Sequence, residues 1–248
     1  MSKSIYIFGF HSIESLLKTN PESVLKVMIQ TGRTDARVNN INEILSELKI
    51  PFSVLDKSNL DHIAKGEVHQ GIISEVILPP LLTEDALLSS IDNLSSKPLI
   101  LILDSIQDPR NLGACLRSAN AAGVSHVIIN KDGSAPINAL VHKTSAGAIN
   151  SLQLFHVTNL SRTIKSIQAK GIWVIGLDGD SPSKIYDVNL SDPTAIVMGA
   201  EGKGIRQLIK KTCDQLVTIP MSGNIESLNV SVATGIALFE SKRQRESS

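Results

Sequence analysis

Residues 98–130 read PLILILDSIQDPRNLGACLRSANAAGVSHVIIN, and this stretch decides the fold class. An apolar run at 98–104 is followed by a helical pattern near 111–122 and by a second apolar run at 126–130. Strands that are apolar throughout are buried on both faces, and helices between them are typical of parallel sheets. The stretch therefore predicts one strand–helix–strand unit of an α/β protein.

The same alternation continues toward the C-terminus. Apolar runs predict further strands at 152–157, 172–178, 195–199 and 215–220, and helical patterns lie near 138–149, 159–170, 203–211 and 227–241. In the last of these helices Leu228, Val232, Gly235 and Phe239 recur at intervals of four, three and four, which predicts one buried stripe. The final residues, SKRQRESS, are expected to form a solvated end.

The N-terminal part shows shorter elements of the same two kinds. Strands are predicted at 24–30, 52–55 and 71–78, and helices at 12–18, 37–48 and 58–64. Residues 79–97 begin with Pro-Pro, are rich in serine and carry only a weak helical pattern, as expected of an interdomain connection. We expect a small α/β domain at 1–78, a linker at 79–97 and a larger α/β domain at 98–248.

Composition narrows the function classes. The 248 residues include 24 Lys and Arg against 24 Asp and Glu, a balance that argues against binding nucleic acid by bulk charge. Two cysteines without CxxC spacing predict free thiols in a reducing compartment. No run approaches the roughly 18 apolar residues of a membrane span, and MSKSIYIFGFH lacks the apolar stretch of a signal peptide. We expect a cytoplasmic protein without a membrane partner.

Three polar clusters each follow an apolar run: NLGACLRS (111–118), GAEGKG (199–204) and IPMSGNIESLNV (219–230). Loops at the carboxyl ends of the strands in an open α/β sheet converge on one crevice, where ligands bind. Alone, Asn111 is suited to cap the helix that carries Arg117, Arg117 to form a surface ion pair, and Ser227 to cap the last helix. Together with Glu201 and Asn229 they suit an adenosine-like ligand and a ribose or phosphate, so the sequence predicts a binding site.

Two phosphate-binding motifs can be compared with the glycine cluster. A P-loop is excluded because Gly202-Lys203 is followed by Gly204 and no glycine stands at Val197. A dinucleotide fingerprint starting at Gly202 lacks its third glycine, because Gln207 occupies that position, although Glu226 lies near the distance expected for a ribose-binding acid. A nicotinamide-dependent enzyme therefore stays a weaker alternative. No Cys/His/Asp cluster has metal-ligand spacing, and no metal is expected.

Three longer segments carry a family resemblance: DPRNLGACLRSANAAGV (108–124), AIVMGAEGKGI (195–205) and IPMSGNIESLNVSVATGIALFE (219–240). They closely resemble the signature motifs of the SpoU/TrmH family of RNA ribose 2′-O-methyltransferases. In the first domain, IFGFHSIESLL and VHQGI are similar to the substrate-binding domain of the bacterial branch that methylates a guanosine of large-subunit ribosomal RNA. The resemblance covers nearly the whole chain.

The resemblance implies a C-terminal catalytic domain with a deep trefoil knot, in which the end of the chain is threaded through a loop. It also implies an obligate homodimer whose active sites form at the subunit interface, and a small N-terminal domain that grips RNA. The cofactor it implies is S-adenosylmethionine, bound by the loops that contribute Met198, Gly199, Ile219, Met221 and Leu228.

The implied reaction is attack by a ribose 2′-oxygen on a sulfonium methyl group. The family assigns the base to the position of Arg117, but an arginine side chain is effectively always protonated. We therefore expect Arg117, lent by the neighbouring protomer, to clamp a phosphate and stabilise the developing oxyanion. The matching positions imply that Asn111 orients the ribose or Arg117, that Glu201 positions the substrate or braces the loops, and that Ser227 and Asn229 hold the closing loop.

The expected substrate is 23S ribosomal RNA. Residues 1–78 hold 8 basic and 9 acidic side chains, and aromatic residues make up 3% of the chain, so we expect RNA to be recognised by shape. Arg33, Arg37, Arg110 and Lys143 are candidate phosphate contacts. Two alternatives stay open within the same fold: methylation of a transfer RNA, and a non-catalytic RNA-binding or ribosome-assembly protein.

Overall fold

The computed structural model describes residues 4–78, 80–94, 96–223, 225 and 227–247. The chain divides into two compact units. The first unit comprises Met1–Pro80 and Asn138–Ser151, and the second comprises Leu81–Ile137 and Leu152–Ser248. The segment 138–151, which holds helix α6 (Ala139–Thr144) and the 3₁₀ turn η2 (Ala148–Ser151), groups with the first unit, although it follows a strand of the second along the chain.

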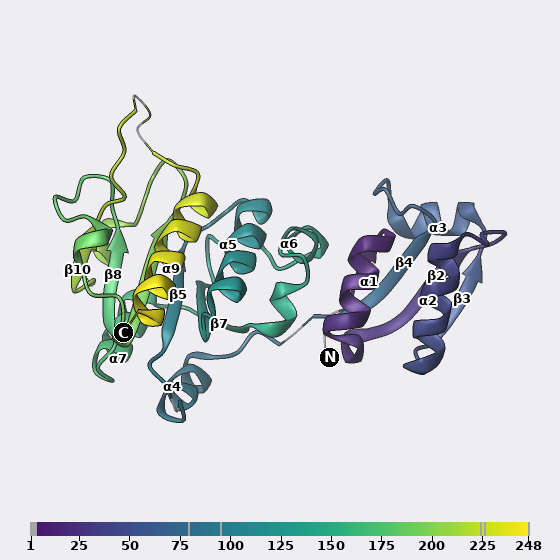
Figure 1. The fold of residues 1–248 in the computed structure, drawn as a ribbon, viewed down its shortest axis with the longest axis horizontal. Helices are drawn as coiled ribbons and strands as arrows, with labels where there is room; N and C mark the ends of the chain where they lie inside the picture. The colour runs from purple at the N-terminus through teal and green to yellow at the C-terminus, as the bar shows by residue number, and fades with distance from the viewer. Residues whose placement is uncertain (1–3, 79, 95, 224, 226, 248) are drawn as a thin grey trace. The chain divides into compact units, whose positions relative to one another are not determined.

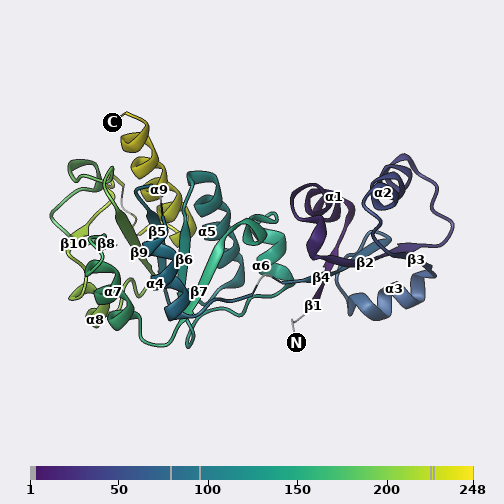
Figure 2. The same ribbon diagram turned by 90° about the horizontal axis from the view of Figure 1, so that it is seen from below.

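The first unit is a four-stranded sheet with helices packed against it (Figure 1). Its elements are β1 (Ser4–Phe8), α1 (Phe10–Thr19), η1 (Pro21–Ser23), β2 (Val24–Gln30), α2 (Ala36–Glu47), β3 (Phe52–Leu55), α3 (Lys57–Ala64) and β4 (Ile72–Ile77), and the strand order is β1-β4-β2-β3. Figure 2 shows α1 and α2 on one face of this sheet and α3 on the other. The first face is covered around Ile13, Leu16 and Leu45, and on the second α3 packs Leu60 against Met28 and Ile73. Strand β1, antiparallel to β4, was missed by the sequence prediction.

The second unit contains the predicted parallel sheet. Its strands are β5 (Leu99–Asp104), β6 (His126–Asn130), β7 (Gln153–Val157), β8 (Trp173–Leu177), β9 (Thr194–Gly199) and β10 (Gln215–Val217). They pair in the order β10-β8-β9-β5-β6-β7, and every pair is parallel. Every residue of β5 and β9 is buried, as continuous apolar runs predict. The threading of the chain end through a loop stays a prediction.

Helices cover both faces of this sheet, as Figure 2 shows. On one face lie α4 (Glu84–Asp92), α7 (Leu160–Gln168) and the short α8 (Gln207–Lys210), which share a core with the inward residues of the strands. On the other face, α5 (Pro109–Ala122) packs along α9 (Val230–Glu246). Helix α4 lies in the segment expected to be a linker, yet its Leu87 and Ile91 are buried in the core of the second unit.

Two helix starts differ from the prediction. The helix carrying Asn111 begins at Pro109, and Asp108 is its N-cap because its carboxylate accepts a hydrogen bond from the main chain of Arg110 at 2.7 Å. Proline at the first helical position needs no N–H partner, so Asp-Pro is the better start signal. The last helix begins at Val230, and its cap is Asn229 rather than Ser227. Asn111 and Ser227 are thereby released from capping.

The prediction of a buried stripe on α9 is wrong, because a different side of the helix is buried. Val232 is 50% exposed and Phe239 is 47% exposed, whereas Gly235 faces Ser118 of α5. The side of α9 that is buried carries Val230, Thr234, Ala237 and Leu238. Apolar periodicity shows which residues share a face, but it does not tell a core-facing stripe from one that faces another molecule.

Part of the segment expected to form a solvated end is packed against the second unit, whereas Glu246 and Ser247 are exposed as predicted. The guanidinium of Arg245 donates to the carbonyls of Lys97, Pro98, Leu190 and Asp192 at 2.6 to 3.1 Å. Gln244 accepts from the Leu190 N–H and donates to the Val188 carbonyl. The last turns of α9 therefore hold the segments that lead into β5 and β9. No helix in the described ranges is long and apolar enough to cross a bilayer.

Replacing Arg245 by alanine is expected to lower the free energy of unfolding of the second unit by about 2 kcal/mol, because main-chain carbonyls lose a charged donor. Trp173, the single tryptophan, lies in β8 and reports on this unit by fluorescence during urea unfolding. The control is Lys242→Ala on the same helix, whose ion pair with Glu246 is an exposed contact at 3.8 Å. The control should change the free energy of unfolding by less than about 0.5 kcal/mol. Equal losses in the two variants would contradict a stabilising role for the hydrogen bonds of Arg245.

Candidate active site

The three polar clusters of the sequence meet beyond the carboxyl ends of β5 and β9. These strands are neighbours, and their last residues, Asp104 and Gly199, are paired in register. From β5 the chain builds outward through β6 and β7, and it then crosses to the other side of β5, where β8 comes first along the chain and β9 fills the place between β8 and β5. The carboxyl ends of β5 and β9 are thus a topological switch point, the place where the sequence predicted a ligand-binding crevice.

A hydrogen-bonded cluster joins one side chain from each segment. The Asn111 amide on α5 donates to Glu201 Oε2 at 2.9 Å. The Asn229 amide at the start of α9 donates to Asn111 Oδ1 at 3.0 Å and to Glu201 Oε1 at 3.2 Å. Both oxygens of the carboxylate are therefore used by neutral donors, which fixes the three segments without neutralising the charge of Glu201. We refer to Asn111, Glu201 and Asn229 as the amide–carboxylate cluster.

The glycine turn after β9 is shaped by its own backbone. Ala200 and Gly204 exchange two main-chain hydrogen bonds, of 3.1 and 2.8 Å. A Cβ on Gly199 would lie 2.0 Å from the carbonyl carbon of Gly204, and Gly202 and Gly204 have positive φ angles. At Gly199 the space that a side chain would occupy is therefore filled by the turn itself. The turn presents Glu201 to the crevice.

Two residues that sequence reasoning missed hold this turn on the sheet. Asp104, fully buried at the end of β5, accepts from the Arg206 main chain at 2.9 Å and from its guanidinium at 2.7 Å. Buried carboxylates are retained only when paired, so this contact fixes the chain just after the glycine turn. An aspartate that ends an apolar strand was the available signal. Its partner, 102 residues away, could not be read from the sequence.

Arg117 and Ser227 are not part of the amide–carboxylate cluster. Arg117 is exposed on α5, and six helical residues place it about 9 Å along the axis and about 120° around it from Asn111. Among the residues that the structure describes, neither Arg117 nor the exposed Ser227 has a hydrogen-bond or ion-pair partner. Both side chains are free to meet another molecule.

The residues expected to bind a cofactor lie at the end of β9 and in the segment between β10 and α9. Met198 and Gly199 are buried at the end of β9, Ile219 and Leu228 are half-buried, and Met221 is 38% exposed. The main-chain N–H groups of Ile219, Met221 and Leu228 make no hydrogen bond to another described residue. An apolar lining with free amides fits an adenine, which presents a flat apolar face and polar ring nitrogens. Glu226, the alternative ribose-binding acid, lies outside the described residues.

Cys115, Cys213 and His126 of the second unit serve packing. Burial raises the pKa of Cys115 to about 11, and burial with the nearby charges of Asp214 and Asp104 raises the pKa of Cys213 to about 12, so both thiols stay protonated. Both are free thiols, as predicted. His126 is hydrogen-bonded through both ring nitrogens to Ser125 and Ser90, and burial lowers its pKa. None of these groups is a base for the crevice.

Comparison with known proteins assigns the class. The sequence profile of the SpoU rRNA Methylase family matches residues 98–239, and a profile described as RNA 2′-O ribose methyltransferase substrate binding matches residues 6–80. The chain belongs to the SpoU rRNA methylase family. The first match contains every residue of the amide–carboxylate cluster.

Its relatives include proteins named 23S rRNA (guanosine-2′-O-)-methyltransferase RlmB. The protein from Shewanella oneidensis is 45% identical over 100% of both chains, and the one from Haemophilus ducreyi is 46% identical over 99% of both. Among solved structures, the SpoU methyltransferase AviRb of Streptomyces viridochromogenes, in complex with AdoMet, has a TM-score of 0.79 at 21% identity, covering 99% of this chain and 92% of that one. The TrmH/SpoU tRNA modifying enzyme of A. aeolicus has a TM-score of 0.57 at 28% identity, covering 66% and 85%.

Replacing Asn229 by aspartate tests the amide–carboxylate cluster while keeping the helix cap. Aspartate caps as well as asparagine and can still accept from the Ser231 N–H, but it turns the donor that faces Glu201 into a second carboxylate. We expect a loss of about 1 kcal/mol at pH 7. The two carboxylates raise each other's pKa in the folded protein, so the loss should disappear as the pH falls below those raised values.

Urea unfolding at pH 7 and pH 5, followed by Trp173 fluorescence, measures this effect. The matched control is Asn159→Asp at the N-cap of α7, where the side chain accepts from the Arg162 N–H and no described carboxylate receives its amide. The control should change stability by only a few tenths of a kcal/mol, about the difference between the two caps. A loss at Asn229 that is no greater than that of the control would refute the proposed contact.

Proposed function

We propose that this chain transfers a methyl group from S-adenosylmethionine to the ribose 2′-oxygen of a guanosine in 23S ribosomal RNA. The observation that carries the proposal is the amide–carboxylate cluster, which unites the three family segments at the switch point of the sheet. Full-length relatives at 44 to 46% identity that bear the 23S rRNA guanosine methyltransferase name support this substrate.

The residues around the crevice fit the cofactor. Met198, Gly199, Ile219, Met221 and Leu228 would hold S-adenosylmethionine, with the four non-glycine side chains against its apolar parts and the free amides of the 219–228 loop toward its adenine. When bound, this cofactor supplies an electrophilic methyl group on a positively charged sulfur. Placing that group and the ribose in one crevice replaces a bimolecular encounter by a bound one, which is the main source of rate enhancement here.

Arg117 is the side chain that we assign to the reacting oxygen. Its guanidinium stays charged, so it does not accept the 2′-hydroxyl proton; it clamps the adjacent RNA phosphate and stabilises the negative charge that develops on the oxygen. The proton leaves to water or to that phosphate. Within the single chain Arg117 stands on a different side of α5 from Asn111, which fits an arginine that serves the crevice of a partner protomer.

The cluster itself positions the substrate. The Asn111 amide has one N–H that the cluster does not use, and this donor orients the ribose; the Asn111 and Glu201 side-chain oxygens are the acceptors that orient the incoming Arg117. Glu201 holds both amides and braces the glycine turn. Ser227, exposed two residues before the cap of α9, lies in the loop that closes over the bound ligands.

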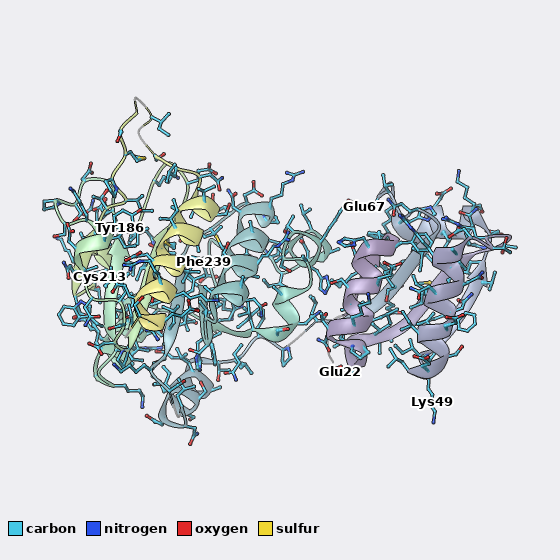
Figure 3. All side chains as sticks on the ribbon, viewed as in Figure 1. Glu22, Lys49, Glu67, Tyr186, Cys213 and Phe239 are labelled. Carbon is cyan, nitrogen blue, oxygen red and sulfur yellow. The ribbon has the colours of Figure 1, made fainter. Side chains whose placement is uncertain are left out.

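A homodimer completes this arrangement. Val232, Ile236 and Phe239 follow one another at intervals of four and three along the outward side of α9, and Phe239 is labelled in Figure 3. Val232 and Phe239 are each about half exposed, and exposed apolar patches on a helix mark protein interfaces. We propose that this face packs against a second copy of the chain.

The same proposal covers the domains and the site of action. The first unit binds the RNA and the second performs the transfer, and a 23S substrate implies work in the bacterial cytoplasm. A transfer-RNA substrate is the less favoured alternative, since the tRNA-modifying structure matches only 66% of this chain. A non-catalytic assembly factor would bind S-adenosylmethionine without transferring its methyl group, and a nicotinamide enzyme would bind NAD instead.

Deleting the chain from cells should remove one 2′-O-methylguanosine from 23S ribosomal RNA, as mapped by mass spectrometry of nuclease fragments. Re-expression should restore it, whereas Arg117→Lys should leave less than about 1% of the activity, because lysine cannot form the planar two-point clamp. Arg117 is exposed, so the variant should keep its stability and its affinity for S-adenosylmethionine. Substantial activity of the Arg117→Lys variant would contradict the clamp, and unchanged methylation after deletion would contradict the substrate.

Phe239→Glu should convert the dimer into a monomer, because a charge would be buried in an apolar interface. Sedimentation velocity measures the change, and methyl transfer should fall with it if Arg117 acts across the interface. Leu208→Glu is the matched control, since Leu208 is 64% exposed on α8 of the same unit. Dissociation by both variants, or by neither, would argue against α9 as the interface.

A further inference from the structure

A cleft in the first unit has no role in the chemistry described above. It has a volume of about 600 Å³ and is bordered by the starts of α1, α2 and α3 and by the turn before β4. Its lining residues are Phe10, Gln30, Arg33, Arg37, Lys57, Asp61, Glu67, Val68, His69, Gln70 and Gly71. The volume lies within the range of small-ligand sites and suits one nucleotide with its phosphate.

The lining of the cleft includes a guanidinium held over an aromatic ring. Arg33 lies 4.8 Å above the centroid of Phe10. Its Nε and Nη2 donate to Asp35 at 2.9 and 2.6 Å, and its Nη1 donates to the Gln70 carbonyl. With all three nitrogens bonded, Arg33 is a fixed plane and not a mobile charge. Arginine planes of this kind stack with the bases of single-stranded RNA.

The turn that carries Gln70 is built around this plane. Gln70 and Gly71 both have positive φ angles, and a Cβ on Gly71 would lie 2.7 Å from Arg33 Nη1. His69 fixes the same turn, because its ring accepts from the Gly71 N–H at 3.0 Å and contacts Asp61 Oδ1 at 2.9 Å. The conformation of the turn formed by His69, Gln70 and Gly71 therefore holds the Arg33 side chain in place.

Two kinds of unpaired polar group surround the plane. The side-chain amides of Gln30 and Gln70 have no hydrogen-bond partner among the described residues, and each offers both a donor and an acceptor. Arg37 and Lys57 are exposed cations that also lack a partner within the described ranges. The carboxylates that line the cleft are Asp61, which bonds His69, and the exposed Glu67.

We propose that this cleft binds one unpaired nucleotide of the substrate RNA, with the base stacked on Arg33, its edge read by Gln30 and Gln70, and its phosphate held by Arg37 and Lys57. This inference rests on the proposed function in taking RNA as the ligand, and it adds a second, non-catalytic point of recognition. The guanidinium plane matches a base, the two side-chain amides match the edge of that base, and the two free cations match a phosphate. A protein ligand would not need all three kinds of group together.

The first test removes the free cations in the full-length protein. Arg37→Gln with Lys57→Gln should raise the KM for a 23S rRNA fragment about tenfold at about 0.1 M salt while kcat and the affinity for S-adenosylmethionine stay unchanged. The slope of log affinity against log salt should fall by about 0.7, because the variant no longer neutralises one phosphate of a single strand and fewer counterions are released on binding. The control pair is Lys18→Gln with Lys49→Gln; Lys49 lies at the opposite end of the unit from Glu67 of the cleft rim (Figure 3).

The second test separates the plane from its charge. Arg33→Lys keeps the charge and removes the plane, so RNA affinity should fall about fivefold or more, within the range of one lost stacking contact, with the salt slope unchanged. Urea unfolding checks that the first unit of the Arg33→Lys variant is folded. If it is not folded, the variants at the exposed Arg37 and Lys57 test the proposal instead.

Equal RNA affinity in the cleft and control variants would overturn the proposal. So would normal affinity for naked RNA combined with weaker binding to ribosomal particles, which would indicate a protein partner. Affinities are measured by direct RNA titration as well as by methyl transfer. If the native protein is inactive, the result counts against the proposed function. The RNA titration still tests whether the cleft binds RNA.

Discussion

The parallel pairing of β5 with β9 is the constraint on which the candidate site depends. It brings Asp104 and Gly199 side by side although they are far apart in sequence. Asp104 then holds Arg206, and the absence of a side chain at Gly199 lets the turn between them close on its own backbone. Both ends of the turn are therefore fixed. This places the Glu201 carboxylate within hydrogen-bonding distance of the Asn111 and Asn229 amides.

Helix α9 links this site to the rest of the second unit. Its first residues supply Asn229 to the amide–carboxylate cluster, and its last turns clamp the segments that enter β5 and β9 through Arg245. The strands that place Asp104 and Gly199 are thus held at their amino ends by the same helix that completes the site at their carboxyl ends. We also assign the outward apolar face of α9 to dimerisation.

The balanced charge of the chain is compatible with an RNA substrate once recognition is divided between two sites. Long-range attraction weakens with salt and carries no sequence information. A cleft with one fixed guanidinium plane and two free amides reads a nucleotide by shape and hydrogen bonds instead. The first unit would select the RNA, and the crevice of the second would need only to position a ribose.

The sequence by itself determined the strand positions of the second unit, its parallel class and the segments that form the site, because apolar runs and glycine turns are local features. Tertiary structure alone decided that Asn111, Glu201 and Asn229 touch one another across separations of 28 to 118 residues. It also decided that Asn229 and not Ser227 caps α9, since neighbouring caps compete and the contact with Glu201 selects one. The partner of Asp104 and the exposed side of α9 depend equally on packing between distant elements, which no local pattern records.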